Sequence, residues 1–84
     1  MTTPEHILSL LGRANAHEAQ AGAYYRQAKG CHDDDRSHYF EKERDEADAA
    51  RELRATAWAL VQADPTLQPP GVVVPAPASP TAGR

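Results

Sequence analysis

The sequence contains few large apolar residues. Leu, Ile, Val and Phe together number twelve among 84 residues, and sixteen alanines supply much of the 40% hydrophobic fraction. So few large apolar side chains cannot easily build an independent core in a chain of this size. The net charge of −3 is too small to indicate a chain kept unfolded by its own charge. We therefore expect one small, alanine-rich domain.

Other absences exclude several classes of protein. No stretch approaches the roughly 20 apolar residues of a membrane-spanning helix. The start of the chain lacks the basic region of a signal peptide, and a single cysteine cannot form an internal disulfide, so we expect a cytoplasmic protein. The chain has 12 acidic and 9 basic residues. This acidic balance argues against a nucleic-acid binder. Seven arginines against two lysines, with abundant Ala and Pro, favour a bacterial or phage source.

Helix-start and helix-stop signals divide the chain into two helices and a tail. Thr3 is placed to cap a first helix over about 4–29. Gly30 is expected to close this helix in the left-handed conformation. One of the aspartates 33–35 is expected to cap a second helix over about 34–63, within which no Gly or Pro occurs. The sequence therefore predicts an all-α fold.

The end of the chain differs in composition from the rest. Residues 65–84 hold six of the seven prolines and only one charged residue, Arg84. Such a segment cannot continue a helix and has no amphipathic period. We therefore expect a disordered, polyproline-like tail that stays apart from a helical domain of residues 1–64. A short docking peptide at Val72–Val74, between prolines, is the alternative.

Apolar and small residues recur at alternating steps of three and four in both helices, the spacing of a coiled-coil seam. If the chain folds back at residue 32, the two series meet layer by layer, and the numbers in each layer sum to 64. The sequence thus predicts an antiparallel two-helix αα-hairpin. The predicted layers are Ile7 with Ala57, Leu11 with Leu53, Ala14 with Ala50, Glu18 with Glu46, Ala21 with Glu43 and Tyr25 with Tyr39.

A second apolar stripe lies beside this seam and consists of Leu8, Leu10, Tyr24, Phe40, Ala47, Trp58 and Val61. A two-helix layer shields only one stripe and buries too little surface to offset the ordering of about 60 residues. We therefore predict a homodimer, in which two hairpins form a four-helix bundle that serves as a non-enzymatic interaction or assembly module. A hairpin that packs against an unrelated protein is the alternative. The expected interface residues are Ile7, Leu8, Leu11, Tyr24, Tyr25, Tyr39, Phe40, Leu53, Trp58 and Val61.

Carboxylates occupy seam positions near the middle of both helices, at Glu18, Glu43 and Glu46, with His17 nearby. In its length, hairpin and acidic second helix the chain resembles the ferritin-like di-iron proteins, a resemblance that implies a carboxylate-bound metal and oxidase or storage chemistry. The Glu-x-x-His motif of that family is absent, since no histidine follows His38. We favour glutamates that tilt outward and pair with Arg or Lys, or that form a polar layer fixing the register of the helices, with no cofactor. A metal-binding, carboxylate-lined four-helix bundle is the alternative function.

A second group of metal-binding residue types lies between the predicted helices, at Cys31, His32, the aspartates 33–35 and His38. Zinc sites usually need two separated pairs of ligands, and this spacing matches no established site. Aspartates at a helix start are explained by capping and by the helix dipole. We therefore expect no metal here and an inert, exposed thiol at Cys31.

Overall fold

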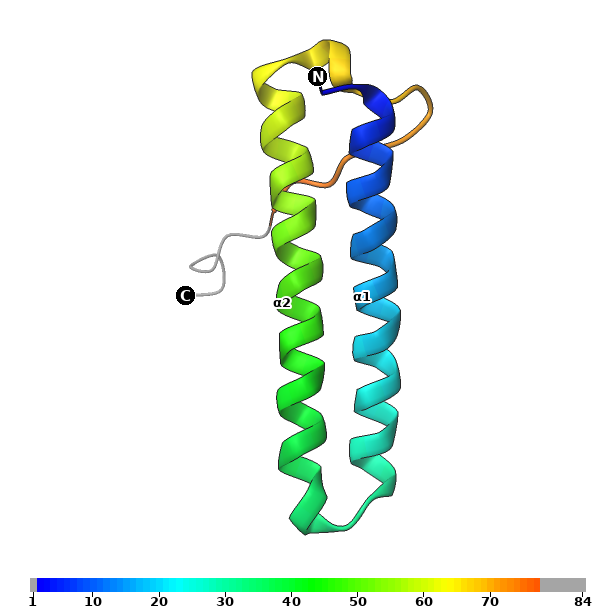
Figure 1. The fold of residues 1–84 in the computed structure, drawn as a ribbon, viewed down its shortest axis with the longest axis vertical. Helices are drawn as coiled ribbons and strands as arrows, with labels where there is room; N and C mark the ends of the chain where they lie inside the picture. The colour runs from blue at the N-terminus through cyan, green and yellow to red at the C-terminus, as the bar shows by residue number, and fades with distance from the viewer. Residues whose placement is uncertain (1, 78–84) are drawn as a thin grey trace.

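The structure, a computed structural model, describes residues 2–77 and is an all-helical hairpin within them (Figure 1). Helix α1 spans Pro4–Gly30, helix α2 spans Asp33–Ala63, and a short 3₁₀ helix, η1, spans Pro65–Leu67. The predicted all-α hairpin and its two helix boundaries are confirmed to within one residue. Its association into a dimer stays a prediction. Neither of the long helices has a stretch apolar enough to cross a membrane.

The two helices begin differently. Thr3 caps α1 as predicted, and its Oγ1 accepts a hydrogen bond from the His6 N–H at 3.4 Å. The prediction of an aspartate cap for α2 is wrong, because His32 is the N-cap and makes no side-chain cap bond. The aspartates 33–35 lie in the first turn instead, where their negative charge faces the positive end of the helix dipole.

The loop between the helices needs no left-handed residue, so the prediction for Gly30 is also wrong. Gly30 stays helical, and Cys31 and His32 both have extended backbone. The Ala28 carbonyl in the last turn of α1 accepts a hydrogen bond from Arg36 Nε at 3.3 Å and a weaker one from the Cys31 thiol. These contacts give the Ala28 carbonyl the hydrogen-bond donors that the backbone of a left-handed C-cap would otherwise supply.

The large aliphatic side chains gather at one end of the hairpin, which we call the closed end. Elsewhere the buried positions of the seam are alanines, such as Ala14, Ala21, Ala28 and Ala50. Small residues let the helices approach closely but bury little surface each. The closed end therefore holds most of the apolar core. Its buried members are Ile7, Leu10, Ala57, Val61 and Leu67, with Leu11, Leu53, Leu60 and Val74 packed against them.

The segment after α2 packs on the hairpin, so the prediction of a detached tail is wrong for residues 65–77. Leu67 is buried in the core cluster, and Pro69 is fully buried. The chain then turns and crosses from α1 to α2 (Figure 1). The Pro69 carbonyl accepts from the Val72 N–H at 3.4 Å, and Gly71 has φ 73°, as position three of a type II turn requires. The rest of the predicted tail, 78–84, lies outside the described residues.

Gly12 offers a direct test of the helical assignment. It lies inside α1, and a Cβ built there meets nothing within 4 Å. Glycine in a helix interior costs roughly 1 kcal/mol relative to alanine. We expect Gly12→Ala to raise the free energy of unfolding by about 0.5–1 kcal/mol, measured by urea denaturation at fixed protein concentration.

Gly71→Ala is the matched control, because its positive φ strains any other residue. This variant should lower the free energy of unfolding by about 1 kcal/mol. A Gly12→Ala variant that is less stable than the wild type would contradict the helix at this position.

Candidate interaction surfaces

Four aromatic rings pair across the hairpin near its loop, and we call Tyr24, Tyr25, Tyr39 and Phe40 the aromatic end. Tyr24 stacks on Tyr39 with ring centroids 6.4 Å apart, and Tyr25 meets Phe40 edge-on at 6.1 Å. The predicted layer of Tyr25 with Tyr39 is therefore wrong by one residue. The buried residues of α1 before and after this level are Ala21 and Ala28. The rings flank the alanine seam as two neighbouring pairs.

The aromatic end is only partly covered by the rest of the chain. The Tyr25 side chain is 43% exposed, and the other three rings are half-buried. Lys29 places its Nζ 5.3 Å from the Tyr25 ring centroid, within the range of a cation–π contact. His38 packs edge-on against Tyr39 with ring centroids 5.3 Å apart. The loop-proximal half of the hairpin thus presents large apolar rings at its surface.

The predicted interface residues of the closed end are largely used inside the chain. Ile7 has no exposed surface and Val61 keeps 8%, because both lie in the core that Leu67 completes. Leu8, by contrast, is 45% exposed. A partner could reach only those residues that keep exposed surface. These are Leu8, Leu11, Tyr24, Tyr25, Tyr39, Phe40, Leu53 and Trp58.

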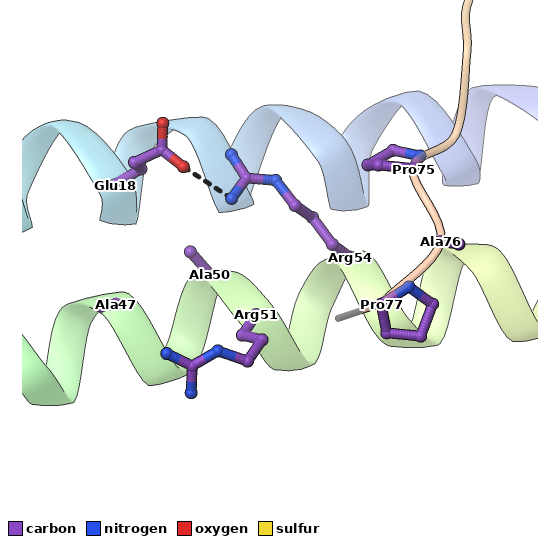
Figure 2. Close-up of a pocket in the computed structure, with 8 residues that line it drawn as sticks. All are labelled: Glu18, Ala47, Ala50, Arg51, Arg54, Pro75, Ala76 and Pro77. Atoms are coloured by element: carbon purple, nitrogen blue, oxygen red, sulfur yellow. Dashed lines mark ion pairs between the residues drawn. The ribbon is translucent and has the colours of Figure 1, made fainter. Parts of the chain in front are cut away.

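The two seam glutamates do not face each other. Glu46 Oε2 lies 2.8 Å from His17 Nδ1, and Glu18 Oε2 lies 2.6 Å from the Arg54 guanidinium (Figure 2). Arg54 also donates to Asn15 Oδ1 at 3.0 Å. The expectation that Glu18 tilts outward and pairs with an arginine is confirmed, and Glu46 pairs with a histidine instead. Two of the three carboxylates on which the metal-binding alternative depends, Glu18 and Glu46, therefore have partners within the hairpin.

The described residues contain no group of three or more His, Cys, Asp or Glu side chains arranged to hold a metal ion. Glu43 is half-buried and lies outside both glutamate pairs. Cys31 is half-buried rather than exposed, because its thiol lies against the Ala28 carbonyl at 3.5 Å. Cys31 and His32 thus form the loop between the helices, and the aspartates 33–35 form the first turn of α2.

Beside the Glu18–Arg54 pair lies an open pocket of about 290 Å³. Both helices and the C-terminal segment contribute its walls, as Figure 2 shows. Ala47 and Ala50 form its small-residue side, and residues 75–77 lie across it. Sequence reasoning missed this feature, because it treated the proline-rich segment as separate from the helices. The apolar residues Leu67 and Val74, spaced among those prolines, were the available signal.

The contact between His17 and Glu46 joins the two helices. In a double-mutant cycle, His17→Ala and Glu46→Ala should couple by about 0.5–1 kcal/mol, the range of a partly exposed pair. The coupling is measured from urea unfolding of the wild type, both single variants and the double variant.

Glu18→Ala with Glu46→Ala is the matched cycle for the layer that the sequence predicted. Its coupling should be near zero, since the structure pairs these glutamates with other residues. A larger coupling for this cycle than for the His17 cycle would mean that the two carboxylates face each other.

Comparisons of this chain with protein-family models, with curated proteins and with solved structures gave no match.

Proposed function

We propose that the protein is a non-enzymatic helical interaction module that self-associates through its aromatic end. Two copies would pack these ends together about a twofold axis, so that four helices meet there as a bundle. The observation that carries the proposal is the incomplete cover of one ring pair, in which Tyr25 is 43% exposed beside the half-buried Phe40.

The uneven distribution of apolar residues supports this location. At the closed end, Leu67 and Val74 from the same chain supply the cover that two helices cannot give each other. Near the loop, the buried seam consists of alanines such as Ala21 and Ala28. The described part of the C-terminal segment lies beside the other end of the hairpin (Figure 1). Aromatic side chains are the commonest anchors of protein interfaces, because they bury much surface at low entropic cost.

The charges around the loop favour a second copy over an unrelated partner. Lys29 stands in the last turn of α1, and the aspartates 33–35 stand in the first turn of α2. A twofold axis between the loops can bring the lysine of each copy toward the aspartates of the other. Such a surface is complementary to itself, which an isologous contact requires.

Substitution of Tyr25 tests the proposal. Tyr25→Ser removes the most exposed ring of the aromatic end, and truncation of an interface anchor costs about 2 kcal/mol or more. We expect the dimer dissociation constant to rise by roughly 30-fold or more, measured by sedimentation equilibrium over a range of concentrations. Circular dichroism of the variant confirms that the helices persist.

Val73→Ser is the control, because Val73 is an apolar residue with 86% exposure that lies away from the aromatic end. It should leave the dissociation constant unchanged. A wild-type chain that is fully helical and monomeric throughout the concentration range would overturn the proposal.

A further inference from the structure

The C-terminal segment crosses the groove between the two helices, and we call residues 72–77 the strap. Two adjoining open spaces, of about 290 and 420 Å³, lie along this groove. Each is lined by side chains of α1, of α2 and of the strap, and Pro75 and Arg54 border both. The groove is therefore larger than the strap that occupies it.

Apolar contact alone holds the strap against the helices. Val74 packs on the core cluster, whereas its neighbour Val73 is 86% exposed. In the part of the chain that the structure describes, the hydrogen bonds of this region are local. The Val72 N–H donates to Pro69, and the Gln68 amide donates to the carbonyls of Pro69 and Val72. Release of the strap would thus break no hydrogen bond to either helix.

The walls of the groove suit an extended chain rich in proline. Gly12, Ala47 and Ala50 give it walls of small residues. Its charged residues are paired within the hairpin, Arg54 with Glu18 and Arg51 with Asp48. A proline has no backbone N–H, so it can lie on such a surface without leaving a donor unpaired. Its extended conformation is also preformed, which lowers the entropy lost on binding.

We propose that this groove is a binding site for an extended, uncharged, proline-spaced peptide, and that its partner is the strap of a second copy. Residues 72–77 already fit the groove within one chain, so the same sequence fits the same groove of another chain once its own strap is displaced. Strap exchange would join two hairpins at their closed ends. It is independent of the aromatic end and uses none of its four rings.

A synthetic peptide tests the groove. A fluorescein-labelled peptide of residues 68–77 is titrated by anisotropy with the full-length wild type and with full-length Val74→Asp, which removes the strap's anchor. We expect at least about 10-fold tighter binding to Val74→Asp, because the wild-type strap competes at an effective concentration in the millimolar range. Val73→Asp is the matched control and should behave as the wild type, since Val73 is exposed.

Three results would overturn the groove as a binding site. One is the absence of saturable binding to Val74→Asp at millimolar concentration while that variant stays helical. Another is equal affinity for the wild type and both variants. The third is equal binding of a peptide that itself carries the Val74→Asp change. Should Val74→Asp fail to fold, Val74→Ser makes the same comparison with a smaller change.

A complementation experiment tests the second copy as partner. Gly12→Trp places a large side chain in the space that Val72 and Pro75 border, so this chain has a blocked groove and a free strap. Val74→Asp has the reverse, an open groove and a defective strap. Both chains also carry Tyr25→Ser, so that association through the aromatic end does not contribute to the outcome.

Mixing the two chains should give a heterodimer by native mass spectrometry, and neither chain alone should dimerise. Peptide binding without a heterodimer would overturn strap exchange, even with the groove confirmed. Failure of the aromatic-end proposal would show as an unchanged dissociation constant for Tyr25→Ser in sedimentation equilibrium, and it would leave these two results unchanged.

Discussion

The burial of Leu67 between the two helices is the contact on which the rest of the hairpin depends. Ile7, Leu10 and Val61 face this side chain at the closed end, and it completes a cluster that the helices alone leave open. Elsewhere the buried seam is alanine, and each buried methylene or methyl group contributes only about 0.8 kcal/mol. Helices of 27 and 31 residues are therefore held together mainly at one end.

This uneven core gives the two ends of the hairpin different roles. The closed end is covered by its own chain, through η1, the buried Pro69 and the strap. The aromatic end has only alanine between its helices, so its large rings flank the seam and keep exposed surface. The same shortage of large apolar residues thus accounts for the need of a C-terminal cover and for the surface that we propose as the contact between copies.

Local chemistry was enough to predict the helices. Thr3 caps α1, the run from 33 to 63 lacks glycine and proline, and a two-residue loop leaves an antiparallel pair as the simple arrangement. The side-chain pairs between the helices were harder to predict. A repeat of three and four residues shows which positions lie along the seam, but it does not show which side chains next to the seam contact each other. Tyr24 with Tyr39 and Tyr25 with Phe40 stand on either side of the predicted layer. For the same reason Glu18 and Glu46 find other partners.

The C-terminal segment could not be placed from composition. Its prolines rule out a continued helix, but they do not prevent Leu67 and Val74 from reaching the core. The most direct test of the account is a set of nuclear Overhauser contacts measured on dilute, methyl-labelled wild-type protein. We predict cross-peaks from the Leu67 and Val74 methyl groups to the methyl groups of the closed-end cluster. Random-coil shifts for both residues, with no such cross-peaks, would show that the hairpin is not closed by its own chain.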